Sequence, residues 1–82
     1  MKDDIILALE DMGYVYRGSG TILGRMHINF EKEDGRAFSD REVDEVYDIA
    51  SMYANVDVYL VHEEVAYAYG VSADAMVDVT IF

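Results

Sequence analysis

The clearest periodic pattern in the chain is helical and covers residues 39–54. Apolar positions there recur three and four residues apart, so they share an arc of roughly 120° on a helix. These positions are Val43, Val46, Tyr47, Ala50, Tyr53 and Ala54. Ser39 and Glu42 have the spacing of a capping box, in which each side chain accepts a hydrogen bond from the other residue's backbone amide. The pattern predicts a helix that starts after Ser39 and buries one face.

The N-terminal half combines a helical pattern with alternating ones. Ile5, Leu9 and Met12 recur on one side of a short helix expected at residues 4–12, and Gly13 suits the left-handed backbone just beyond a helix end. Residues 14–17 are β-like, residues 18–20 are expected to turn, and residues 21–31 alternate as in a half-buried antiparallel strand. Asp34-Gly35 is a typical hairpin dipeptide, which predicts a short returning strand at residues 36–38.

The C-terminal half contains one ambiguous segment. Residues 56–61 alternate as a strand, and residues 75–81 alternate again. Residues 63–76 between them fit either another strand or a helix-turn-helix, and the surrounding alternation favours the strand. A DNA-reading helix-turn-helix would need Lys or Arg on its second helix to contact phosphates, whereas Asp74 and Asp78 are the only charged residues in 72–82.

Together these segments predict one domain over residues 1–82 with an α+β fold. We expect a small antiparallel sheet with two helices on one face, in the order α-β-β-(β)-α-β-β-β. A chain of 82 residues can bury one two-layer core. The sequence has no cysteine, no signal-peptide pattern and no apolar run long enough to cross a membrane, so we expect a soluble cytoplasmic domain.

Charge is distributed unevenly between the two halves. The net charge is −11, and all six Lys and Arg residues lie within residues 1–41. Residues 42–82 contain acids but no Lys or Arg, so this half repels nucleic acid and anionic lipid and attracts basic surfaces. The simpler interpretation is that the acids maintain solubility. Direct nucleic-acid binding and membrane binding are not expected.

Catalytic and metal-binding motifs are weak or missing. His62 precedes Glu63 and Glu64, but neighbouring residues of a strand point to opposite faces, so three converging metal ligands are not expected. The acids of residues 31–35 lack the spacing of a calcium loop. Without cysteine or a Gly-x-Ser-x-Gly elbow, no activated nucleophile is indicated. We expect neither enzymatic activity nor a cofactor.

The acidic side of the predicted central helix is the candidate binding surface. Carboxylates four residues apart on one face destabilise a helix slightly, which suggests an external partner. Ile49 and Met52 are expected to be exposed beside them as apolar contacts. Glu63 and Glu64, together with Asp57, Asp74 and Asp78, could extend the surface if the C-terminal strands lie beside the helix. The candidate partner-binding residues are Asp40, Asp44, Glu45, Asp48, Ile49, Met52, Glu63 and Glu64.

In its size, acidity, lack of cysteine and acidic helix SDREVDEVYDIASMYA, the chain resembles small phage proteins that mimic nucleic acid. This class includes DNA-mimic anti-CRISPR proteins and uracil-DNA glycosylase inhibitors. The resemblance implies an inhibitor, anti-CRISPR-like, whose carboxylates replace phosphates on the basic surface of a host nuclease or CRISPR effector. The alternative is a generic protein-interaction module, for example a homodimer formed through a sheet edge.

Overall fold

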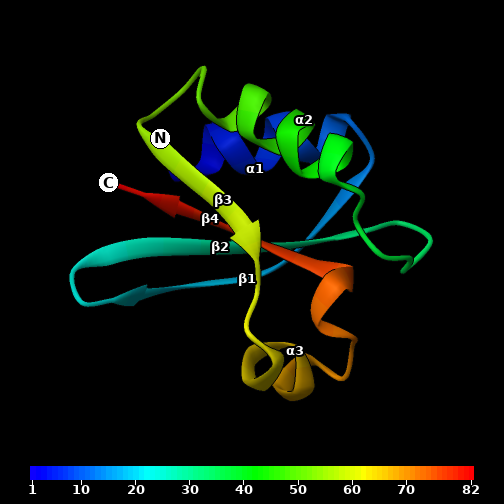
Figure 1. Ribbon diagram of the computed structural model, residues 1–82. Helices are drawn as coiled ribbons and strands as arrows, with labels where there is room; N and C mark the ends of the chain where they lie inside the picture. Colours follow the sequence, from blue (N-terminus) through cyan, green and yellow to red (C-terminus); the bar gives the residue numbers. More distant parts are fainter.

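The chain forms a four-stranded antiparallel sheet with helices on both sides (Figure 1). The computed structural model describes all 82 residues. The elements are α1 (Lys2–Asp11), β1 (Tyr14–Ile22), β2 (Arg25–Lys32), α2 (Asp40–Ala50), β3 (Val56–Leu60), α3 (Glu63–Tyr69), the single-turn 3₁₀ helix η1 (Ala73–Ala75) and β4 (Met76–Ile81). The strand order is β1-β2-β4-β3. The predicted α+β class is therefore confirmed.

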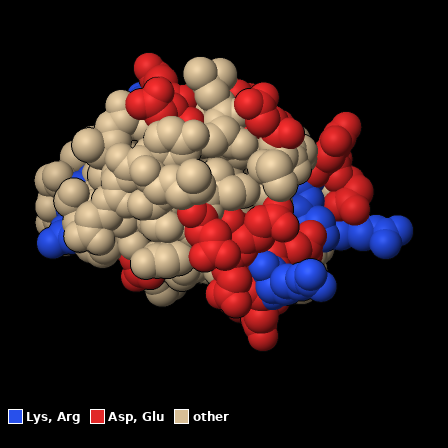
Figure 2. Space-filling model, turned by 90° about the horizontal axis from the view of Figure 1, so that it is seen from above, with Lys and Arg blue, Asp and Glu red and all other residues tan.

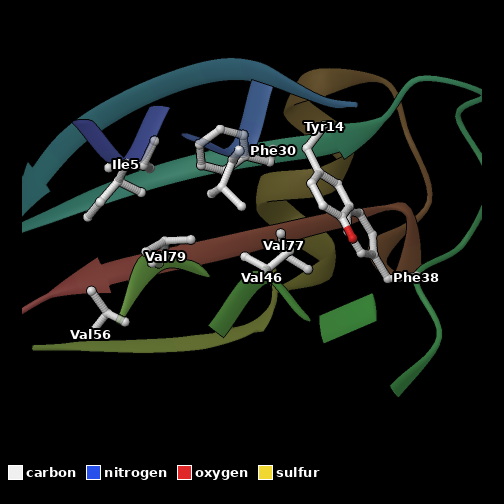
Figure 3. Packing of buried hydrophobic residues seen from close by; sticks show 11 residues of the cluster. Ile5, Tyr14, Phe30, Phe38, Val46, Val56, Val77 and Val79 are labelled. Atoms are coloured by element: carbon white, nitrogen blue, oxygen red, sulfur yellow. The ribbon is translucent and has the colours of Figure 1, made fainter. Parts of the chain in front are cut away.

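Helices α1 and α2 lie together on one face of the sheet, the α1–α2 face, and α3 lies on the other, the α3 face (Figure 1). The main core is on the α1–α2 face, where alternate residues of β2 and β4 meet the buried stripes of both helices (Figure 3). At one end of this core the rings of Tyr14 and Phe38 stack with centroids 5.8 Å apart. Its members are Ile5, Leu9, Tyr14, Ile28, Phe30, Phe38, Val46, Ala50, Val56, Val77 and Val79.

A smaller apolar cluster lies on the α3 face and consists of Val61, Ala66 and Met76. Because α3 and the main core lie on opposite sides of the sheet, β4 is buried on both. Val77 and Val79 pack into the main core, while Met76 contacts the cluster under α3. The central position of β4, between β2 and β3, makes this double burial possible.

Residues 63–69 are a helix, so the strand expected there was wrong. Glu63 and Glu64 lie in the first turn, where acids interact favourably with the helix dipole. Gly70 ends the helix in the left-handed conformation that glycine adopts without strain. The amide of Val71 then donates to the carbonyl of Ala66 at 3.0 Å. The helix-turn-helix alternative was correct only for this first helix, because the segment continues through the single turn η1 into β4.

The turns of the N-terminal half also differ from the expected ones. The β1–β2 hairpin turns at Leu23-Gly24, and the glycines of residues 18–20 lie within β1. Gly18 is needed for a close contact: a Cβ at this position would lie 2.7 Å from the hydroxyl of Tyr69 in α3. Residues 36–38 form no returning strand, because Phe38 instead donates its amide to the carbonyl of Asp74 at 2.7 Å.

Candidate functional site: the carboxylates of α2

Helix α2 is a well-anchored carrier for acidic side chains. The predicted capping box, in which two residues satisfy each other's backbone amides, is present. Ser39 accepts from the amide of Glu42 at 3.2 Å, and Glu42 accepts from the amide of Ser39 at 3.0 Å. Val46 and Ala50 are fully buried against the sheet. The backbone of α2 therefore holds its outward side chains at fixed spacing.

Two of the α2 acids have partners within the chain. Glu42 pairs with Lys32 of β2 at 2.8 Å, and hydrogen bonds from Lys32 and from the Ser39 amide lower the pKa of Glu42 to about 2. The hydroxyl of Tyr14 donates a hydrogen bond to the carboxylate of Glu45 at 2.9 Å. Burial of the phenol, together with the Glu45 carboxylate, raises the pKa of Tyr14 above its usual value. These two acids therefore help to hold α2 on the sheet.

Asp40, Asp44 and Asp48, the α2 carboxylate row, are exposed, and their side chains form no hydrogen bond or ion pair within the chain. They follow one another every four residues, so they rise by about 6 Å per step along the helix axis. Arg41 is the only base on α2 and is also exposed. The row thus presents negative charge to solvent and forms no ion pair with a cation of the same chain.

The apolar residues beside the row differ from those expected. Ile49 is half-buried and packs against the main core, so its predicted exposure was wrong. Tyr47, expected in the core, is 44% exposed at the other margin of the buried stripe. The helix is rotated so that its core-facing side is centred closer to Ile49 than to Tyr47. Met52 is 77% exposed, as expected, in the turn after α2.

The remaining acids do not extend the row. Glu63 and Glu64 are exposed in α3, which lies across the sheet from α2 (Figure 1). Asp78 is buried on the α3 face. Seen from the side of α1 and α2, acidic atoms form several groups, which are separated by uncharged surface and, on one side, by Lys and Arg atoms (Figure 2). Glu63, Glu64 and Asp78 therefore do not extend the α2 carboxylate row, because the condition for that extension, a position beside α2, is not met.

A polar cluster that the sequence did not reveal lies on the α3 face. Asp78 of β4 accepts from the hydroxyl of Thr80 at 2.6 Å and lies 3.0 Å from Nδ1 of His27 in β2. Thr80 also contacts the hydroxyl of Tyr59 in β3 at 3.0 Å, and burial is the main cause of the raised pKa of Tyr59. Strand register produces this cluster, because Asp78 lies opposite both Asn29 and Tyr59.

The side chains of His27, Tyr59, Asp78 and Thr80 are hydrogen-bonded to one another. One atom, Oδ1 of Asn29, is buried without a partner, while its Nδ2 donates weakly to the hydroxyl of Tyr69 at 3.3 Å. Exchanging the two amide atoms would let Asn29 accept a hydrogen bond from the hydroxyl of Tyr69. No group of three or more His, Asp or Glu side chains converges as metal ligands would. The cluster is accounted for as internal structure.

Comparison of the chain with family models, curated proteins and solved structures found no match. No helix has the length and hydrophobicity needed to cross a membrane; α2, the longest, has 11 residues.

Proposed function

We propose that the protein is a small acidic inhibitor that binds the basic nucleic-acid-binding surface of a host enzyme, as DNA-mimic anti-CRISPR proteins do. The observation that supports this function is the α2 carboxylate row, which is exposed and has no cation of the same chain as partner. Its axial step is of the same order as the separation of neighbouring phosphates on a nucleic-acid strand. A nuclease or a CRISPR effector offers the Lys and Arg side chains that such a row would engage.

In this proposal, charge and apolar contact contribute differently to binding. The net charge of −11 steers the protein towards a cationic cleft and speeds its encounter with that cleft. Tyr47 and Met52 flank the row with exposed apolar surface, which adds contact area that charge alone does not supply. Association should therefore weaken as salt rises, because exposed charges are screened with a Debye length of about 10 Å at 0.1 M.

The test begins with capture of binding partners from bacterial lysate at low salt, followed by elution at high salt and competition with a duplex DNA oligonucleotide. The proposal predicts release of a nucleic-acid enzyme by both treatments. The triple variant Asp40→Asn, Asp44→Asn, Asp48→Asn should weaken that complex by at least tenfold.

A matched control separates the α2 carboxylate row from net charge. The triple variant Glu63→Gln, Glu64→Gln, Asp74→Asn also removes three negative charges, from exposed positions near α3 and η1. It should bind almost as tightly as the unaltered chain. An equal loss of affinity in both triple variants would show that binding depends on overall charge and that the α2 carboxylate row is not the binding site. A partner that resists salt and tolerates both variants would favour a generic interaction module instead.

A further inference from the structure

Strand β1 has one free edge. Its only neighbour in the sheet is β2, and no backbone hydrogen bond from a loop or helix reaches residues 14–22. Natural proteins protect such edges with short strands, Pro, charged side chains or bulges, because the unpaired N–H and C=O groups can pair with another chain. β1 is nine residues long, and its one irregularity lies between Tyr16 and Gly18. Residues 18–22, called the β1 edge here, pair with β2 in regular register and contain no charged side chain; Tyr69 of α3 lies against Gly18 at one end.

The β1 edge is also where two copies of this molecule could approach with least repulsion. A symmetric dimer places the same surface of each copy against itself, so an acidic surface would oppose its own association. Residues 12–30 contain no Asp or Glu, although the chain has 17 of them. The other edge strand, β3, carries exposed Asp57 and leads directly into Glu63 and Glu64.

The hairpin tip beside this edge exposes apolar side chains in a strained turn. Leu23 is 98% exposed and has φ +51°, and Ile22 is 58% exposed. The left-handed region is unfavourable for leucine, and Asn before Gly24 would suit this turn better. Leu23 therefore contributes neither burial nor favourable backbone geometry within one copy.

We propose that two copies associate through their β1 edges, aligned antiparallel, so that their four-stranded sheets become one continuous sheet. Pairing centred near Gly20 sets Ile22 of one copy beside Gly18 of the other. The same alignment places Leu23 of one copy opposite Arg17 of the other, at the irregularity of β1, and symmetry repeats this contact at both ends. This dimer is independent of the proposed inhibitor function, because the α2 carboxylate row and the β1 edge belong to different elements.

Sedimentation equilibrium tests the dimer from about 10 µM to about 1 mM, where weak complexes form. The dimer should strengthen with added salt, because screening reduces repulsion between two copies that each carry a net charge of −11. Binding of a basic partner should weaken with salt, so the two proposals fail independently. A monomer at every concentration and in high salt would overturn the dimer.

Three variants locate the interface. Thr21→Glu places an acid on both facing edges and should raise the dissociation constant at least tenfold. Leu23→Asn should raise the midpoint of thermal unfolding, because Asn accepts the turn geometry, yet weaken dimerisation several-fold. Leu7→Asn, at a 62% exposed position on α1, should leave dimerisation unchanged. Dimerisation that is unaltered by Thr21→Glu and Leu23→Asn, or that is abolished equally by Leu7→Asn, would contradict the proposed edge.

Discussion

The two faces of the sheet are held by different interactions, apolar packing on one and hydrogen bonds on the other, although the same strands contribute to both. On the α1–α2 face, Phe30 and Val77 are fully buried members of the apolar main core. On the α3 face, the next residues in the same strands are polar: Asn29 of β2 donates to the hydroxyl of Tyr69 in α3, and Asp78 of β4 is hydrogen-bonded to Thr80. β4 is buried on both faces of the sheet: Val77 on the α1–α2 face is fully buried, and Asp78 on the α3 face is 6% exposed.

This difference shows what each face contributes to the fold. Apolar packing on the α1–α2 face provides most of the stability. Hydrophobic residues can pack together in many arrangements, however, so this packing alone does not select one strand register. The α3 face is more selective. A one-residue slip of β4 would move Asp78 and Thr80 into the apolar core and break their contacts with His27 of β2 and Tyr59 of β3. We infer that the α3 face fixes the register of the sheet that the α1–α2 face stabilises.

Truncation of Phe30 should have the largest effect. Phe30→Ala removes a fully buried ring at the centre of the α1–α2 face and should lower the free energy of unfolding by about 3–5 kcal/mol. Chemical denaturation followed by far-UV circular dichroism measures this change. Val15→Ala, at an exposed position of the same sheet, is the control and should leave the free energy of unfolding almost unchanged. Similar losses for both variants would mean that the α1–α2 face is not the dominant core.

Removal of the carboxylate at the centre of the α3 face should have an intermediate effect. Asp78→Ala removes the buried carboxylate that accepts from the hydroxyl of Thr80 and contacts Nδ1 of His27, which should lower the free energy of unfolding by about 1–3 kcal/mol. A double-mutant cycle with Thr80→Val should give less than additive losses, because the two side chains are hydrogen-bonded. Additive losses would show that the cluster does not act as a unit.

The sequence predicts which residues are buried on the α1–α2 face better than it predicts the polar contacts of the α3 face. Helical spacing identified Val46 and Ala50 as buried, and the Ser39 capping box placed the start of α2. Periodicity within one segment carries that information. It does not say which residues of distant strands face each other, so the pairing of His27 with Asp78 could not be anticipated.

The same limit explains the errors in the candidate site. The exposure of Asp40, Asp44 and Asp48 followed from the helical period, since that period fixes their common face. Whether Glu63 and Glu64 join them depended on which side of the sheet their segment occupies, and this segment was expected to be a strand. The strand pattern of residues 63–69 failed because helix-end signals and tertiary packing decided the structure of a short segment.

Disturbing the contact between Gly18 of β1 and Tyr69 of α3 should lower the free energy of unfolding less than Asp78→Ala does. Gly18→Ala places a methyl group 2.7 Å from the Tyr69 hydroxyl, which is too close, so α3 must shift. The free energy of unfolding should fall by about 1 kcal/mol, as is common for an overpacked contact. Tyr69→Phe removes that hydroxyl, and the double variant should recover part of the loss. Thermal unfolding of the four combinations measures the coupling. No recovery in the double variant would show that Gly18 is required for a reason other than Tyr69.

The smallest effect on the free energy of unfolding is expected for the ion pair of Glu42 and Lys32, and this effect depends on pH. The pKa of Glu42 is about 2 in the folded chain against an ordinary value of 4.5, so its ionised form favours folding above pH 4.5. This contribution should be lost as pH falls from about 4.5 towards 2. Glu42→Gln should therefore be less stable than the unaltered chain at pH 6, and the difference should narrow across that interval. Lys32→Met should reduce the same difference at pH 6, because Lys32 is the largest cause of the lowered pKa. A Glu42→Gln difference that is constant from pH 6 to pH 2 would show that the ion pair and the capping box do not couple to folding.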